Sequence, residues 1–531
     1  MTTETFASVD NLVWIAVVAV GLSLLLRSRG IGTALPLLGC GIVIALLPIG
    51  PTAPAAPEAI QALVLAPLVF GEALSSSYID IKKVRRPVLA LAVLLVAATT
   101  LVVGGVVAAL LVAIPAAMAL ALGAILAPTD AVAVATAARR ANLPARIVSV
   151  LEGESLVNDA TGLTALRVAV VAAVAGSITI VEAGAVLVQS VTVGLAIGVA
   201  SGWILVMMLR HSSDVVGFGG LLLIAPLPIY MVTEELDGSA ILAIVTAALM
   251  ASHASHSDPS YRGRLAVATV WRQITFILQS IAFLLLGLEL PFAIGDLPEA
   301  QVRLLPVTVL AVTVVLIITR MIFVFGMFGL ERATSKSPTG GWRSAVVIGW
   351  AGARGPVSAL AAFSLPFIAE SGSPIPYRDF VVATALCVIL VTLMISPTLG
   401  PLARALRIED TNAPSTQGWV RSALARAALA ALESAETDAD RDGEPLSPET
   451  VRTLRHQMEQ RLHPDADNTA AVTRVRQLAE VGLAMAQAEQ RELIRLRTEA
   501  GLPDAVVRPL MTDIDQRIAS LRAARKSPGS A

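Results

Sequence analysis

The segment LEGESLVNDATGL, residues 151–163, carries the side chains of this chain best suited to hold a small cation or a proton. Glu154 and Asn158 are four residues apart, as are Ser155 and Asp159, so in a helix all four lie on one face. Two carboxylates, a hydroxyl and an amide then form a row of oxygen ligands, which hard cations prefer. The surrounding sequence is apolar, so these charges need partners or water.

Two other segments place a charge beside helix-breaking residues. ILAPTDAVAV, residues 125–134, has Pro128 before Thr129 and Asp130, and WAGARGPVSAL, residues 350–360, has Arg354 among Gly352, Gly355 and Pro356. Proline removes a backbone hydrogen bond, and a break inside a membrane survives only beside protein or water. Helix dipoles suggest that Asp130 offsets half-helix N-termini and Arg354 offsets C-termini. Interrupted helices at matching places in two halves indicate an inverted-repeat secondary transporter.

Five ionisable residues fall deep within apolar runs: Asp130, Glu154, Asp159, Arg320 and Arg354. Each costs at least ~2.5–3.5 kcal/mol at the middle of a bilayer unless it is paired or hydrated. Counted from the flanking charges at the helical rise, each lies about 12–20 Å inside a core roughly 30 Å thick. Four spans therefore bring charges to one depth, as an ion site requires.

The composition defines the setting. The 531 residues are 55% hydrophobic and only 15% charged, with a net charge of −1, which is far too apolar for a soluble chain. We expect an all-α polytopic membrane protein with about thirteen transmembrane helices. The predicted spans are 11–26, 32–48, 57–72, 87–113, 116–138, 147–176, 183–209, 218–233, 238–252, 269–290, 303–330, 342–368 and 378–402.

Basic residues alternate between the predicted loops. The positive-inside rule then places the N-terminus outside and the end of the chain in the cytoplasm of a bacterial inner membrane. We expect residues 1–404 to form the membrane domain and residues 405–531 a charged helical cytosolic tail, either regulatory or supporting a dimer. Ser447 and Gly501 are the expected start and stop of tail helices, and the acidic segment 436–445 the linker.

The charges that lie at this common depth limit the kinds of substrate that the site can bind. Three acids and two bases leave one negative charge, which one monovalent cation or one proton would cancel. A desolvated carboxylate favours its proton and a bound cation favours the ionised form, so the two ligands compete at Asp159. Such competition with alternating access is one-for-one antiport.

The segments APTDAVAV, LEGESLVNDATGL, IITRMIFVFG and WAGARGPVSALAAFSLP resemble, in this order, the sodium/proton exchanger family of monovalent cation:proton antiporters, in particular its bacterial NhaP-like branch. FLLLGLELP at 283–291 and LVFGEALSSSYIDIKKVRRP at 68–87 are similar to the same family. The likeness covers essentially the whole membrane part. Ala131 departs from the pattern, since relatives often have proline there.

The resemblance implies an inverted-repeat fold, a homodimer, and a moving bundle that carries the ion. It implies that Asp159 binds cation and proton, with Ser155, Asp130 and the Thr129 backbone completing the shell. It pairs Glu154 with Arg320 and makes Arg354 the arginine of the second crossed helix. The Asn158–Asp159 pair is the form associated with electroneutral exchange.

Several alternatives stay open. Na⁺, Li⁺ and K⁺ are not distinguished, and a K⁺-selective antiporter or a cation channel fits the same charges. An intramembrane aspartyl protease also buries two carboxylates, but its Gly-x-Gly-Asp motif is absent. Asp130, Glu154 and Arg320 could be purely structural, and Arg167 is expected to extend to the outer interface. His253 and His256 lack metal partners, and we expect no cofactor, no enzymatic activity and no nucleic-acid partner.

Overall fold

The structure, a computed structural model, describes residues 3–29, 32–47, 61–130, 143–176, 178–211, 215–257, 261–334, 341–408, 423–424, 426–437, 447–449, 451–455, 469–499 and 504–526. Its contacts divide the chain into two compact units, Met1–Asp410 and Thr411–Ala531, which are described separately. The roles predicted for the two parts stay predictions.

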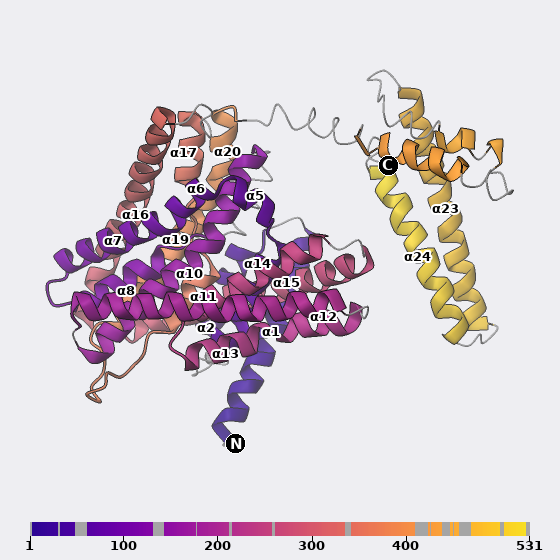
Figure 1. Ribbon diagram of the computed structural model, residues 1–531. Helices are drawn as coiled ribbons and strands as arrows, with labels where there is room; N and C mark the ends of the chain where they lie inside the picture. Colours follow the sequence, from indigo (N-terminus) through magenta and orange to yellow (C-terminus); the bar gives the residue numbers. More distant parts are fainter. Residues whose placement is uncertain are drawn as a thin grey trace. The chain divides into compact units, whose positions relative to one another are not determined.

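The first unit is built from helices, and its described residues contain no strand beyond a single antiparallel bridge between Ile368 and Pro374. Its N-terminal half contains α1 (Thr3–Ser28), α2 (Ala34–Ala45), the π-helical η1 (Gln61–Leu65), α4 (Ala66–Ser75), α5 (Tyr78–Lys83), α6 (Arg85–Leu89), the π-helical η2 (Ala90–Leu95), α7 (Val96–Leu110), α8 (Ala116–Leu126) and α10 (Ala145–Ala175). Figure 1 shows these helices packed against those of the second half.

The second half of this unit contains α11 (Ile180–His211), α12 (Val215–Ile224), α13 (Pro226–Glu235), α14 (Ala240–Ser257), α15 (Tyr261–Gly295), α16 (Glu299–Thr334), α17 (Trp342–Trp350), α18 (Pro356–Phe363), α19 (Arg378–Ile395), the 3₁₀ turn η3 (Ser396–Thr398) and α20 (Leu399–Ala405). The prediction of an all-α fold is confirmed.

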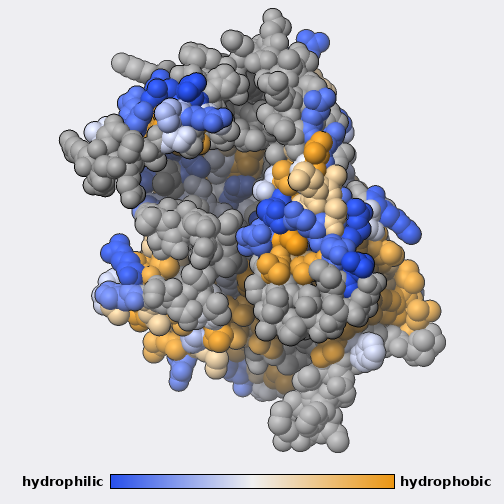
Figure 2. All heavy atoms as spheres, turned by 90° about the vertical axis from the view of Figure 1, so that its right-hand side faces the viewer, coloured by the Kyte–Doolittle hydropathy of each residue, from blue (hydrophilic) through white to orange (hydrophobic). Residues whose placement is uncertain are grey.

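The helices have the length and composition of membrane spans. Among the described residues, six helices are long and apolar enough to cross a bilayer, for example residues 145–175 and 299–331, and five shorter helices of 10–17 residues are also apolar. Large apolar side chains such as Leu101 and Ile322 are more than 60% exposed, and Figure 2 shows broad hydrophobic areas on the surface. This is a polytopic membrane protein, because lipid, unlike water, favours such a surface.

Every predicted span contains a described helix, but some are divided. The run 218–233 is two helices that meet at Pro226, where the missing N–H ends α12. The run 342–368 is α17 and α18 with residues 351–355 between them, and the run 116–138 is helical to Leu126 and lies outside the described residues from 131 onward. Helix ends do not place a bilayer, so a total of thirteen crossings stays a prediction.

Glycines spaced four residues apart fasten α11 to α14. A Cβ atom on Gly194 would lie 2.7 Å from the Ser239 carbonyl oxygen, and one on Gly198 would lie 2.7 Å from that of Ala243. Small residues let helix backbones approach closely where the hydrophobic effect cannot drive association. The two helices and the turn before α14 therefore pack at close range.

The second unit contains an α-helical hairpin. Its helices α23 (Thr469–Glu499) and α24 (Asp504–Lys526) lie side by side (Figure 1), and Leu483, Leu493 and Ile518 are among the side chains buried between them. The sequence predicts a helical tail, and the described helix α23 ends at Glu499, close to the predicted stop at Gly501. Ser447 accepts a main-chain hydrogen bond from Val451, whereas Gly501 and most of the segment 436–445 lie outside the described residues.

Candidate ion-binding site

The helix α8 stops in the interior of the first unit. Its last residue is Leu126, and the chain continues without helical structure through Pro128, Thr129 and Asp130. The proline ring packs where Gly162 of α10 has no side chain, so any Cβ there would clash with it. A proline and a facing glycine together fix the position of this break.

A second interruption crosses the first. Residues 351–355 separate α17 from α18, and the Asp130 N–H donates to the Ala353 carbonyl oxygen at 2.8 Å. The two non-helical segments are more than 200 residues apart in sequence. This hydrogen bond gives a backbone N–H of one segment and a backbone carbonyl of the other a partner in a place where water is scarce.

Arg354 and Asp130 lie at opposite kinds of helix end. The Arg354 guanidinium donates from Nε to the Leu126 carbonyl oxygen at 2.8 Å, at the C-terminus of α8, and from Nη1 to the Gly352 carbonyl. The Asp130 carboxyl group lies against Gly355, the residue before α18, where a Cβ would be 2.5 Å from its Cγ atom. Each charge therefore faces the helix-dipole end of opposite sign.

One face of α10 contacts the first interruption. The Ser155 hydroxyl donates to the Thr129 carbonyl oxygen, and Asn158 Nδ2 donates to Thr129 Oγ1 at 2.9 Å. Within the described residues, the buried Asn158 Oδ1 has no hydrogen-bond partner. The helix face thus brings Ser155, Asn158 and Asp159 to the Thr129–Asp130 segment, and oxygen atoms predominate there.

Glu154, on the same helix, accepts a long hydrogen bond from Thr129 Oγ1 (3.5 Å) and has a second partner. Its carboxylate and Arg320 of α16 form a two-pronged ion pair, with Nη2 2.8 Å from Oε2 and Nη1 bonded to Oε1. Arg320 also donates from Nε to the Ile348 carbonyl oxygen at 3.2 Å, in the last turn of α17. Both side chains are at most 3% exposed, so this pair joins α10, α16 and the second interrupted helix.

Asp159 is different from Glu154, although both are buried. Its side chain makes no hydrogen bond or ion pair within the described residues, and its electrostatic neighbours are Glu72 and Asp130. A buried carboxylate near two other acids and away from any base needs a proton or a cation.

Sequence reasoning missed Glu72. It lies on α4, partly buried, within hydrogen-bond distance of Gln279 Nε2 on α15 (3.4 Å) and close enough to Asp130 to interact with it electrostatically. The sum of three acids and two bases is therefore wrong, because a fourth acid belongs to the group. It is the last residue of the predicted span 57–72 and is not among the residues predicted to lie deep within apolar runs.

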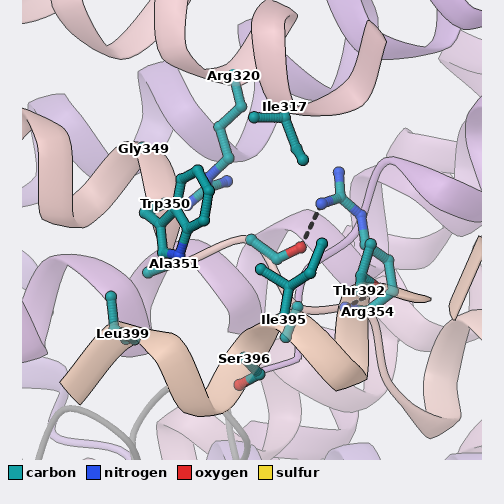
Figure 3. A pocket seen from close by; sticks show the side chains of 12 residues that line it. Ile317, Arg320, Gly349, Trp350, Ala351, Arg354, Thr392, Ile395, Ser396 and Leu399 are labelled. Atoms are coloured by element: carbon teal, nitrogen blue, oxygen red, sulfur yellow. Dashed lines mark hydrogen bonds between the residues drawn. The ribbon is translucent and has the colours of Figure 1, made fainter. Parts of the chain in front are cut away.

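A hollow opens beside the second interruption (Figure 3). Arg320 and Arg354 reach it from two sides, and Trp350, Ala351 and Thr392 also line it. Asp159 and Ser155 do not line it, so this hollow is not the oxygen-rich site itself.

Two other expectations are decided by the structure. Arg167 does not simply extend to the interface: it forms ion pairs with Glu234 (3.0 Å) and Asp237 (2.9 Å), because the turn after α13 folds back over α10. The His253 ring packs against Tyr78, with centroids 4.9 Å apart, and the side chain of His256 lies outside the described residues.

The fold and this crossing define a class, the helical membrane transporters with paired interrupted helices. A family model described as the transmembrane sodium/hydrogen exchanger matches residues 14–405. A sodium, potassium, lithium and rubidium/H⁺ antiporter of Bacillus pumilus is 34% identical over 68% of this chain and 56% of its own length. The chain thus spans little more than half of that relative.

Two further similarities cover a larger share of the protein that is compared. An uncharacterized Na⁺/H⁺ exchanger of Mycobacterium tuberculosis is 30% identical over 94% of both chains. The solved structure of the sodium proton antiporter MjNhaP1 from Methanocaldococcus jannaschii shares the fold, with a TM-score of 0.61 and 17% identity over 76% of this chain and 99% of that one.

The chain belongs to the sodium/hydrogen exchanger family. The resemblance to its bacterial NhaP-like members is confirmed at the level of the family, which consists of transporters and not enzymes.

Proposed function

We propose that the chain exchanges one monovalent cation for one proton by alternating access, with both ligands competing for Asp159. Na⁺ is the first candidate cation, and Li⁺ and K⁺ are the others; no resident cofactor takes part. Ser155, Asp130, Asn158 and the Thr129 oxygens would complete the cation shell.

One observation carries this proposal: Asp159 is 3% exposed and lacks a basic partner within the described residues, while the site's two arginines are engaged elsewhere. Arg320 is held by Glu154 and by the end of α17, and Arg354 by carbonyl groups. A carboxylate left without counter-charge in a low-dielectric site must take its positive charge from a mobile ligand.

Glu72 changes the charge argument without removing it. Four acids and two arginines leave two negative charges instead of one when all are ionised. One-for-one exchange then requires that one of these carboxyl groups keeps the same protonation state through the cycle. We assign this role to Glu72, which stays protonated beside the acidic Asp130 and Asp159. If Glu72 also released and rebound a proton in each cycle, two protons would be exchanged for one cation and the exchange would be electrogenic.

The relatives support the class of substrate. The Bacillus pumilus relative is named for sodium, potassium, lithium and rubidium, which are all monovalent cations. Carboxylate, hydroxyl and carbonyl oxygens suit each of these ions, and selectivity among them depends on cavity size and ligand field.

The oligomeric state, the membrane and the orientation of the chain are also part of the proposal. We infer a homodimer in the bacterial inner membrane, with the N-terminus outside and residues 405–531 in the cytoplasm as a regulatory or dimer-supporting tail. The alternation of basic loops supports this orientation.

Reconstitution in liposomes tests the function. An imposed pH gradient should dissipate when Na⁺ is added, at a rate independent of membrane potential. Replacing Asp159 by Asn should abolish this exchange while the protein still elutes as a folded species. The proposal fails if no alkali cation dissipates the gradient, and a conductance that needs no counter-ion would indicate a channel.

A further inference from the structure

Arg167 joins α10 to the turn between α13 and α14. It lies eight residues after Asp159 on α10, about 12 Å along the axis. Its guanidinium binds Glu234 Oε2 at 3.0 Å, Asp237 Oδ1 at 2.9 Å and the Gly238 carbonyl oxygen at 2.7 Å. One side chain thus holds three acceptors, one from the end of α13 and two from the turn that follows it.

This turn is firmly fixed to α11. The Ser239 N–H donates to the Ser190 carbonyl oxygen at 2.8 Å, and the Gly238 N–H donates to that of Thr233 at 2.8 Å. A Cβ on Gly238 would meet Val193 and Thr233 side-chain atoms at 2.7 Å. The turn is therefore held closely against α11 and α14, and any movement of α10 relative to these helices would have to break its contacts with the turn.

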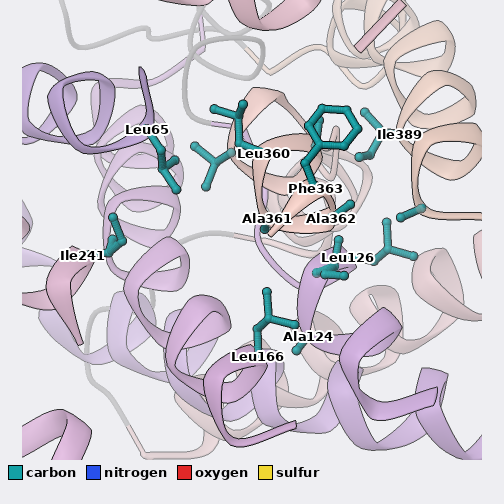
Figure 4. Close-up of a cluster of buried hydrophobic side chains, with 14 of the residues drawn as sticks. Leu65, Ala124, Leu126, Leu166, Ile241, Leu360, Ala361, Ala362, Phe363 and Ile389 are labelled. Atoms are coloured by element: carbon teal, nitrogen blue, oxygen red, sulfur yellow. The ribbon is translucent and has the colours of Figure 1, made fainter. Parts of the chain in front are cut away.

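A second hydrogen bond lies one turn earlier on α10. The Thr164 hydroxyl donates to Ser239 Oγ at 2.8 Å. Beside these contacts, Leu166 of α10 and Ile241 of α14 are buried in an apolar cluster with Leu65, Leu126 and Leu360 (Figure 4). These five side chains are part of the large hydrophobic core of the first unit, and we call this group of five the apolar plug. It draws side chains from the interrupted helices and from the α11–α14 pair.

We propose that Arg167 is a positioning residue that latches α10 to the α13–α14 turn and so keeps the apolar plug closed over one side of the Asp159 site. Opening the site to that side requires the guanidinium to leave Glu234, Asp237 and Gly238. The inference rests on the proposed exchange, since only a moving α10 needs a latch.

The ion pairs of Arg167 are weak enough to break and re-form, as a reversible latch requires. Arg167 is 20% exposed, Glu234 43% and Asp237 73%, measured on their side chains. Ion pairs this accessible are weak compared with the buried Glu154–Arg320 pair, so they can break in each cycle. Water can also replace the lost partners of the guanidinium.

Thiol accessibility tests the latch directly. In a chain with Cys40 and Cys387, both free thiols, replaced by Ala, Ile241→Cys places a reporter in the plug. A membrane-impermeant maleimide is added to either side of proteoliposomes. Arg167→Gln should raise the labelling rate about fivefold from the side of the α13–α14 turn only, and Arg167→Lys should restore most of the protection.

Transport provides the second readout. Arg167→Gln should change the apparent KM for the cation measured from that side, because it shifts the balance of the two orientations. Arg303→Gln is the matched control, since it removes an exposed ion pair with Glu299 (2.6 Å) on α16 and should alter neither readout. A structural role alone would change the amount of folded protein and leave these side-specific values intact.

Unchanged labelling in Arg167→Gln overturns the latch. If that variant does not fold, Asp237→Asn removes one exposed partner and should still raise labelling, and equal labelling there also overturns it. Failure of the wild type to exchange any cation would refute the proposed function, whereas labelling reports on the latch independently.

Discussion

At the scale of residues, four acidic side chains share one region but have different surroundings. Glu154 is neutralised by Arg320, Asp130 faces the start of α18, Glu72 contacts Gln279, and Asp159 has acidic neighbours alone among the described residues. Because the net cost of a buried charge depends on its partners, these carboxylates should respond differently to substitution.

Loss of the arginine of the ion pair should be costly. Arg320→Gln leaves Glu154 buried without its counter-charge, which typically costs ~3–5 kcal/mol. The thermal midpoint of the purified protein in lipid nanodiscs should fall clearly, and the double variant Glu154→Gln, Arg320→Gln should recover part of the loss. Arg303→Gln, which breaks an exposed pair, should cost less than ~1 kcal/mol. Equal shifts for both single variants would contradict a structural role for the buried pair.

The point where the two interrupted segments cross has no space for an added methyl group at Gly355. In Gly355→Ala, the new Cβ would lie 2.5 Å from the Asp130 carboxyl carbon, so Asp130 must move and exchange should fall at least ~10-fold. Gly326→Ala on α16 meets no atom within 4 Å and should keep wild-type exchange in the same liposome assay. Normal activity of Gly355→Ala would show that the position of Asp130 does not matter.

At the scale of elements, the interruptions were the most predictable part of the site. Pro128 and the cluster of Gly352, Gly355 and Pro356 mark both breaks in the sequence, because proline and glycine act on their own backbone. The positions of Ser155 and Asp159 on one face of α10 follow equally from helical periodicity.

Contacts set by tertiary packing could not be predicted in this way. Glu72 reaches the site because α4 packs beside α14 and α15, and nothing near it in sequence indicates that neighbour. The partners of Arg167 come from a turn about 70 residues later, where Asp237 has a left-handed backbone (φ 57°). Only the folded chain places them against α10.

Glu72→Gln tests the retained proton. A protonated Glu72 contributes no charge, so Glu72→Gln should leave the affinity for Na⁺ within about twofold of the wild type. Loss of a negative charge near the site would instead weaken Na⁺ binding about fivefold, the factor that corresponds to ~1 kcal/mol for a screened charge at close range. The exchange rate should stay independent of membrane potential, because a carboxyl group that never ionises carries no charge through the cycle. A wild-type rate that depends on membrane potential, together with a potential-independent rate in Glu72→Gln, would show that Glu72 releases its proton in the wild type.

At the scale of the whole molecule, the two compact units suggest separate tasks. A chain ending at Asp410 keeps all described residues of the first unit, so it should insert, fold and exchange with a maximal rate within about threefold of the full chain, a difference below ~1 kcal/mol in barrier. If the tail is regulatory, the pH at half-maximal rate should shift in the same liposomes. Loss of folded protein would instead make the tail a structural support.

The central claim concerns one carboxylate shared by two ligands, and the dependence of cation affinity on pH tests it most directly. The apparent KM for Na⁺ should be measured in proteoliposomes over a range of pH, with the saturated rate recorded at each value. Competition at Asp159 predicts that KM rises by up to about tenfold for each unit of falling pH while the saturated rate stays constant. A KM that does not change with pH, with a saturated rate that falls as protons are added, would mean that cation and proton occupy different sites.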